Sequence, residues 1–248
     1  MRCQPQRLFQ VYNWLFNDQT CLLCDERSDL HLPICEPCLA DLPWLRDACP
    51  RCALPMPLAG LTCSACSHRA PAFEDVVIAW QYDFPIDALV TRFKHRGQWP
   101  IGRLLADLLA QQVLHRFEEG LERPDVLIPV PLGKRRLRQR GYNQAAMLAR
   151  WLGGTLEAPV LENLLLRTRE TAAQQNLNAN ERRRNLRGAF SVQRPERIEG
   201  RHVTLVDDVM TTGSTANILA RLLRDAGARR VDLYCLARTP APATHTER

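Results

Sequence analysis

Eight of the ten cysteines stand in four Cys-x-x-Cys pairs, and their spacing is typical of metal binding. The pairs begin at residues 21, 35, 49 and 63, so each begins 14 residues after the one before it. A short turn of this kind aims two thiolates at one point, and two turns complete a tetrahedral site with Zn–S distances of ~2.3 Å. The pattern therefore predicts two structural zinc ions, with the ligands Cys21, Cys24, Cys35, Cys38, Cys49, Cys52, Cys63 and Cys66.

The spacing leaves open how the four pairs combine. A sequential arrangement joins the first pair with the second and the third with the fourth, whereas a crossed arrangement joins the first with the third and the second with the fourth. Either arrangement surrounds each zinc with four thiolates, which leaves no position for the water molecule that a catalytic zinc keeps. Such a short segment also has few residues for a hydrophobic core, so the metal would supply much of its folding free energy.

A second group of residues could bind a phosphorylated sugar. Two adjacent carboxylates, Asp207 and Asp208, follow an apolar run and precede the turn Thr211, Thr212, Gly213, Ser214 and Thr215, after which a helix is expected. The backbone N–H groups of such a turn, its hydroxyls and the positive end of a helix favour a phosphate monoester. The two carboxylates can accept hydrogen bonds from vicinal hydroxyls, so the segment predicts a site for ribose 5-phosphate.

The alternative for the two acids is a magnesium-binding strand of a nucleoside triphosphatase. That class needs an upstream Gly-x-x-x-x-Gly-Lys-Ser/Thr loop to hold the phosphates. The chain has no such loop, because Gly133-Lys134 is followed by Arg135 and has no glycine five residues before it. The sequence therefore favours the sugar-phosphate interpretation.

These groups need a framework that brings them to one edge of a sheet, and the rest of the chain supplies it. Apolar runs predict strands over 76–80, 125–130, 189–192, 203–206 and 231–236, and helical spacing predicts helices over 86–96, 101–118, 143–152 and 215–226. The segment 161–166 fits a strand or a short helix, and the polar segment 168–187 is expected to be a long mobile loop. Strands that alternate with helices indicate an α/β fold with a parallel sheet, which binds ligands beyond the carboxyl ends of its strands.

Composition and charge indicate a folded protein in two parts. The 248 residues are 46% hydrophobic and 24% charged, which is ordinary for a globular chain of one or two domains. Residues 1–70 have six basic and seven acidic side chains, whereas 71–248 carry a net +7, since the whole chain carries +6. We expect a zinc module over 1–70 and an anion-binding domain over 71–248.

The same composition bears on location. No apolar run approaches the ~20 residues that cross a bilayer, and the N-terminus does not have the pattern of a secretory signal. Because disulfide frameworks belong to secreted proteins, this favours metal binding for the cysteines. The expectation is a cytoplasmic protein without a membrane span.

The motif at 207–215 resembles the 5-phosphoribosyl 1-pyrophosphate (PRPP) binding motif of type I phosphoribosyltransferases. Together with the four cysteine pairs, the chain resembles the ComF family of competence-associated proteins over roughly residues 20–240. The further segments that carry this resemblance are 129–132, 140–144, Gln174, Leu177, Arg182, Asn185 and 188–190. The resemblance implies a type I phosphoribosyltransferase-like parallel sheet flanked by helices, with a small N-terminal double zinc ribbon.

The resemblance also implies roles for individual residues. Asp207 and Asp208 would bind the ribose hydroxyls and serve as catalytic residues, and the turn 211–215 would hold the 5-phosphate. The segment after Val130 would be the pyrophosphate loop, with Arg135 near the diphosphate, and 168–187 would close over the reacting centre. Magnesium would arrive with PRPP, and an unidentified acceptor would displace pyrophosphate at C1.

Two interpretations of function remain open at this stage. One is a phosphoribosyltransferase of nucleotide metabolism or DNA uptake, with an acceptor read by the segment 71–100, where Lys94, His95 and Arg96 are candidate contacts. The other is a non-catalytic PRPP sensor or a protein that binds single-stranded DNA and partners of the DNA-uptake machinery. The basic runs at 134–140 and 182–187 suit a diphosphate, a nucleic-acid backbone or a solvated surface.

Overall fold

The computed structural model describes residues 19–168 and 188–241. By their contacts, the residues group into two compact units, 1–42 and 43–248, which are described separately below. The division expected from sequence, 1–70 and 71–248, differs from this grouping because the second half of the cysteine-rich segment belongs to the larger unit. The domain boundary at residue 70 stays a prediction.

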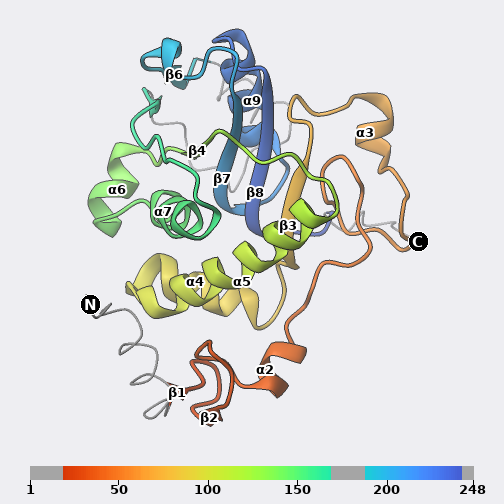
Figure 1. Ribbon diagram of the computed structural model, residues 1–248, viewed down its shortest axis with the longest axis vertical. Coiled ribbons are helices and arrows are strands. Elements are labelled where there is room, and N and C mark those ends of the chain that lie inside the picture. Colours follow the sequence, from red (N-terminus) through yellow and green to blue (C-terminus); the bar gives the residue numbers. More distant parts are fainter. Residues whose placement is uncertain (1–18, 169–187, 242–248) are drawn as a thin grey trace, which may run out of the picture. The chain divides into compact units, whose positions relative to one another are not determined.

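The smaller unit is organised around the first two cysteine pairs (Figure 1). It contains the strands β1 (Gln19–Thr20) and β2 (Arg27–Ser28), which pair antiparallel, and the helix α2 (Glu36–Ala40). The buried hydroxyl of Ser28 donates to the carbonyl of Ile34 (2.7 Å) and so ties the two halves of the unit together. These short elements present their cysteines to one another with little apolar core around them.

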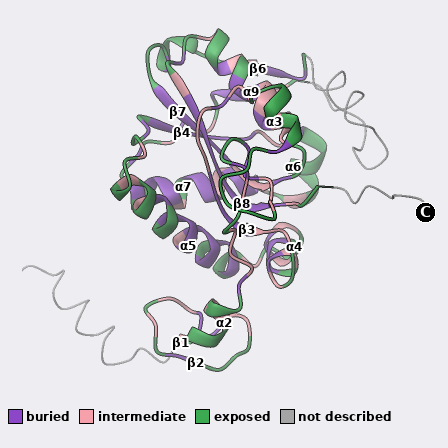
Figure 2. Ribbon diagram, turned by 90° about the vertical axis from the view of Figure 1, so that its right-hand side faces the viewer, coloured by how far each residue is buried: buried purple, intermediate pink, exposed green. Residues whose placement is uncertain are grey.

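The larger unit contains a four-stranded parallel sheet in the order β3-β8-β7-β4. The strands are β3 (Val76–Gln81), β8 (Arg230–Arg238), β7 (His202–Met210) and β4 (Val126–Pro129). The central strand β8 is almost continuously buried, and β7 is buried except at the half-buried residues 207–209, as expected for a parallel sheet covered on both faces (Figure 2). Because all four strands run in one direction, their carboxyl ends form one edge.

Helices cover both faces of this sheet. On one face lie α5 (Trp99–Glu118), which packs on β3 and β8, and α7 (Gln144–Leu156), which packs on β4 and β7. On the other face α9 (Ser214–Asp225) packs on β7 and β8 (Figure 1). The remaining elements of the unit are α3 (Ser64–His68), α4 (Ile86–Arg96), α6 (Lys134–Arg140), the antiparallel pair β5 (Leu165–Arg167) and β6 (Phe190–Val192), and the 3-10 helix η2 (Pro195–Arg197).

The second pair of cysteine turns is built into this larger unit. The N–H of Leu45 donates to the carbonyl of Ala79 (2.9 Å), so residues 43–45 run alongside the edge strand β3. Cys49, Cys52 and Cys63 are buried and belong to the same hydrophobic core as the sheet residues. The core that holds β7 and β8 therefore also holds the second cysteine cluster.

The structure confirms the predicted α/β class and most predicted elements. Two differences matter for the site: β7 continues past the two acids to Met210, and residues 134–140, for which no element was predicted, form the helix α6. Of the segment 161–166, residues 161–164 form a turn and the last two residues begin the strand β5. Most of the expected closing loop, 169–187, lies outside the described residues. Within the ranges that are described, no helix has both the length and the hydrophobicity of a membrane span.

Candidate functional site

The two acids lie inside β7, near the carboxyl edge of the sheet. Asp207 is in register with Cys235 of β8, and Met210 at the end of β7 is in register with Arg238. Successive side chains of a strand point to opposite faces, so the two carboxylates meet different neighbours. Asp207 lines a small cavity formed with the turn after the strand, whereas Asp208 faces a lysine from α4.

The turn 211–215 folds around that cavity. Gly213 caps α9 and has a φ of 70°, a left-handed conformation that glycine adopts without strain. The hydroxyls of Thr212 and Ser214 lie 2.9 Å apart, so these two side chains hold each other at the start of the helix. The cavity of about 40 Å³ is lined by Asp207, the whole turn, Leu233 and Cys235. The structure thus brings Asp207 and all five predicted turn residues around one small space, at the N-terminus of α9.

Burial and the charge of its neighbour change the acidity of the first carboxyl. Burial, together with the Asp208 carboxylate, raises the pKa of Asp207 to about 7. The backbone N–H of Asp208 donates to Asp207 Oδ1 (2.9 Å) and acts in the opposite direction. Burial and the two carboxylates also raise the pKa of the Cys235 thiol, which stays protonated beside them. Perturbed acids in a cavity are a common property of functional sites.

Cations from two helices approach the acid pair. Lys94 Nζ lies 3.0 Å from Asp208 Oδ1, and both side chains are mostly buried. Burial lowers the pKa of Arg140, and the nearby Asp208 carboxylate acts against that effect. Burial, with the charges of Arg140 and Lys94, lowers the pKa of His95, so this imidazole is neutral at pH 7. The site therefore combines two carboxylates with two cations, at positions that an anionic ligand could reach.

A hydrogen-bonded loop joins these helices to β4. Asn143 caps α7 by accepting the N–H of Ala145 (3.1 Å), and its amide donates to the carbonyl of Val130 (3.0 Å). The hydroxyl of Tyr142 donates to the carbonyl of Phe93 in α4. Through these contacts the residues around Arg140 are fixed to both the sheet and α4.

The remaining predicted binding residues stand as follows. Arg135 lies on the exposed face of α6, and its proposed role at a diphosphate stays a prediction. Arg182, Arg183 and Arg184 lie outside the described residues. On sequence alone, Lys94 is only a candidate acceptor contact and Arg140 only part of a basic run. The buried Arg238 was missed, although a charge at the carboxyl end of a buried strand is a usable signal.

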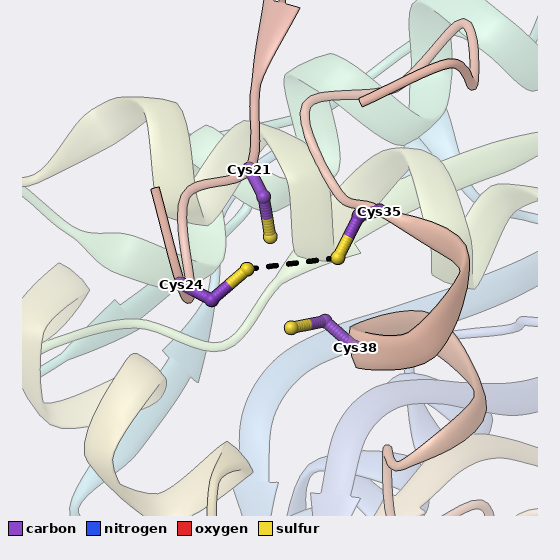
Figure 3. Close-up of side chains that lie close together, drawn as sticks. All are labelled: Cys21, Cys24, Cys35 and Cys38. Carbon is purple, nitrogen blue, oxygen red and sulfur yellow. Dashed lines mark hydrogen bonds between the residues drawn. The ribbon is translucent and has the colours of Figure 1, made fainter. Parts of the chain in front are cut away.

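The cysteines form two separate groups of four, which settles the pairing as sequential. One group is Cys21, Cys24, Cys35 and Cys38, and the other is Cys49, Cys52, Cys63 and Cys66. Within each group the ligand atoms lie within 4.8 Å of one another, and the four thiols of the first group converge in Figure 3. The sulfurs of Cys24 and Cys35 lie 3.6 Å apart, and so do those of Cys52 and Cys63. Tetrahedral zinc with ~2.3 Å bonds needs sulfurs about 3.8 Å apart, so both groups fit the ion.

Backbone N–H groups favour the thiolate form at one cysteine of each group. Burial raises the pKa of Cys21 and Cys49, but backbone N–H donors outweigh it and lower these pKa values to about 6 and about 7. Leu23 N–H lies 3.4 Å from Cys21 Sγ, and Cys63 N–H lies 3.4 Å from Cys49 Sγ. Since a metal binds the thiolate, this backbone arrangement suits zinc ligands.

Comparison with family models agrees with this architecture. The double zinc ribbon domain matches residues 11–67, and the phosphoribosyl transferase domain matches residues 145–247. Fold, cysteine groups and family models together define a phosphoribosyltransferase-like protein with a double zinc ribbon.

Curated relatives identify the family. The chain is 38% identical over 221 residues to the DNA utilization protein YhgH of Escherichia coli O157:H7, a match that covers 88% of this chain and 96% of the relative. It is 36% identical over 226 residues to competence protein F of Haemophilus influenzae, with the same shares covered. The protein therefore belongs to the ComF family, as its motifs indicated.

Solved structures match parts of the chain at low identity. A purine phosphoribosyltransferase from Pyrococcus horikoshii matches with 19% identity and a TM-score of 0.35, covering 59% of this chain and 78% of that one.

Proposed function

We propose that this protein binds PRPP at the carboxyl edge of its sheet. The observation that carries the proposal is the cavity enclosed by Asp207 and the turn 211–215 at the N-terminus of α9. The turn would hold the 5-phosphate with backbone N–H groups and hydroxyls, because the positive end of a helix favours an anion. The carboxylates of Asp207 and Asp208 would accept hydrogen bonds from the ribose hydroxyls.

The cations beside the acid pair support a site for the diphosphate. Lys94 and Arg140 flank Asp208, and Arg135 lies on the same short helix as Arg140. Positive charge there would stabilise the leaving pyrophosphate when a nucleophile attacks C1 of the ribose, so the transfer would be driven largely by electrostatics. An incoming diol would compete with Lys94 for Asp208, which would release the lysine toward the diphosphate.

Magnesium fits this proposal as an ion carried by PRPP. It prefers phosphate and water oxygens with one or two carboxylates, and Asp207 and Asp208 are the acids that the site offers. When bound, the ion would neutralise charge on the diphosphate. The acceptor is unidentified, and the reaction class is pentosyl transfer with release of pyrophosphate.

Calorimetry with magnesium and PRPP tests the binding site. Replacing both Asp207 and Asp208 with Ala removes charge-assisted hydrogen bonds, each worth about 1.5–3 kcal/mol, so affinity should fall at least about tenfold. Ribose 5-phosphate serves as the comparison ligand, since it lacks the diphosphate. Arg135→Ala and Arg140→Ala should weaken PRPP more than ribose 5-phosphate; unchanged PRPP affinity in the double Asp variant would refute the site.

Turnover is tested separately from binding. Pyrophosphate release should be measured with a panel of nucleobases, with and without single-stranded DNA. Release that requires magnesium and an added acceptor would establish a transferase. PRPP binding without release for any acceptor would favour a sensor.

Single-stranded DNA is the second candidate ligand, and the surface of α6 is the observation that favours it. Four of its seven residues, Lys134, Arg135, Arg136 and Arg138, are exposed cations. A dense row of cations suits a phosphate backbone, and relatives carry names that refer to DNA utilization and competence. In this interpretation the protein acts in the cytoplasm beside the DNA-uptake machinery.

A salt titration with a labelled oligonucleotide tests this second candidate. Replacing one α6 cation that binds a phosphate with Ala should reduce the salt slope by ~0.7. A flat salt response in the wild-type protein would remove DNA from the list of ligands.

A further inference from the structure

One buried arginine connects the second cysteine group to the phosphate turn. Arg238 ends β8 and is only 5% exposed. Its Nε donates to the carbonyl of Cys52 (3.1 Å), and its Nη1 donates to the carbonyls of Met210 (3.2 Å), Thr211 and Thr239 (2.8 Å). The guanidinium is a planar fork with fixed donor directions, so it can hold several backbone carbonyls in one geometry.

The two segments that Arg238 joins have different functions in the molecule. Cys52 belongs to the cysteine group that fits zinc. Thr211 is the first residue of the turn that surrounds the small cavity beside Asp207. Arg238 thus links a metal ligand to the start of the phosphate turn across 186 positions of sequence.

The space around this link is hollow rather than tightly packed. A cavity of about 250 Å³ lies between the second cysteine group and the turn, with Cys66 and Phe73 on one side and Gly213 and Ser214 on the other. Arg238 lines the same cavity. The N–H of Ala72 donates to Asn217 Oδ1 across this cavity (2.8 Å), but that contact reaches the body of α9. The hydrogen bonds of Arg238 connect a cysteine of the second group directly to the turn.

We propose that Arg238 is a positioning residue through which zinc in the second cysteine group sets the phosphate turn. Zinc holds Cys52, the Cys52 carbonyl holds the guanidinium, and the guanidinium holds the carbonyl of Thr211. The N–H groups of the turn are then preorganised before a ligand binds. This raises the affinity for an anion, because less ordering of the turn is required on binding. The inference rests on the proposed PRPP site and adds that its affinity depends on the second zinc and not on the first.

Matched cysteine variants give the first test. Cys66→Ser removes a ligand of the second group without changing a hydrogen-bond partner of Arg238, and Cys38→Ser removes the corresponding last ligand of the first group. Both residues are half-buried. Metal analysis should give two zinc ions in the wild type and one in each variant. We expect PRPP affinity to fall about tenfold in Cys66→Ser and to change less than twofold in Cys38→Ser.

Variants of Arg238 test the proposal even if a cysteine variant does not fold. Arg238→Met removes every donor, whereas Arg238→Lys keeps a charge and three donors on one nitrogen. With both zinc ions retained, affinity for PRPP should fall in the order wild type, Arg238→Lys, Arg238→Met. Because coupling between sites is reciprocal, PRPP should also slow the extraction of one zinc ion by a chelator and leave the other unaffected.

Amide hydrogen exchange measures the coupling between the second cysteine group and the turn 211–215 without an added ligand. Exchange in the peptide that contains 211–215 should accelerate in Cys66→Ser and in Arg238→Met, and stay at the wild-type rate in Cys38→Ser. If the wild-type protein fails to bind PRPP, the proposed function is wrong while this measurement still decides the coupling. Equal exchange in all variants would overturn the role of Arg238.

Discussion

The two ends of the parallel sheet hold their carboxylates in opposite ways. At the amino end, Asp232 accepts hydrogen bonds from His202 Nε2 (2.9 Å), Arg230 Nε (3.1 Å) and the N–H of Asp75 (3.1 Å). Burial raises the pKa of Asp232, but the bonds from His202 and Arg230 outweigh it and the pKa falls. At the carboxyl end, burial and Asp208 raise the pKa of Asp207.

The charges of these two aspartates therefore have opposite effects on the stability of the folded protein. The carboxylate of Asp232 is surrounded by donors of the protein itself, so its charge favours the folded state. Asp207 lies in a cavity beside a second carboxylate, so its charge opposes folding. Functional sites commonly carry such a cost in stability, and the following predictions test whether the two ends differ as described.

The largest effect is expected at the amino end. Asp232→Ala leaves the buried His202 and the half-buried Arg230 without this acceptor, and breaking a buried ion pair costs about 3–5 kcal/mol. Denaturant unfolding should show a loss of that size. Because the pKa of Asp232 is lowered, the contribution of its charge is present above about pH 4 and fades only as the pH falls below that. A loss below about 1 kcal/mol would remove the distinction between the two ends.

At the carboxyl end, removing the carboxylate is expected to increase stability rather than to decrease it. Asp207→Asn removes a charge that the cavity disfavours, and it should stabilise the protein by on the order of 1–3 kcal/mol at pH 8. A raised pKa means that the wild-type protein loses stability as the pH rises from about 4 to about 7. The gain in the variant should therefore grow through that window and stay constant above it. A stability curve that is independent of pH in this window would contradict the raised pKa.

A smaller loss is expected when the acid pair loses its cation. Lys94→Met removes the partner of Asp208 and leaves two neighbouring carboxylates, so stability at pH 8 should fall by about 1–2 kcal/mol. Since the charge of Lys94 also lowers the pKa of Asp207, that pKa should rise further in the variant. NMR titration of the Asp207 carboxyl measures this pKa. An unchanged pKa in the variant would show that the charge of Lys94 does not act on Asp207.

The smallest effect should come from an exposed pair far from either end. Arg150 and Glu162 form an ion pair on the surface, with Arg150 Nη2 2.6 Å from Glu162 Oε2. Exposed pairs contribute about 0–1 kcal/mol, so Glu162→Gln should change stability by less than that. This variant controls for the general effect of removing one charge, and a loss as large as that of Asp232→Ala would show that burial is not the deciding factor.

Motifs made of neighbouring residues could be predicted from sequence, whereas contacts between distant segments could not. The cysteine turns and the segment 207–215 each lie within a short stretch, so their geometry follows from local spacing. The ion pair of Lys94 with Asp208 joins α4 to β7, and no periodicity in either segment indicates it. The contacts of the second cysteine group with the core of the sheet could likewise not be predicted, because they join residues that lie far apart in the chain.

The amino-acid sequence by itself determined two cysteine groups suited to zinc, an α/β sheet and an acid pair before a turn that contains glycine, because each depends on residues close together in the chain. Tertiary structure decided which groups surround them. The sheet order β3-β8-β7-β4 places the ends of β7 and β8 side by side, and this brings Arg238 to Thr211 and Asp232 to His202. Strand order arises from the packing of the whole core, and local patterns of hydrophobic residues do not encode it.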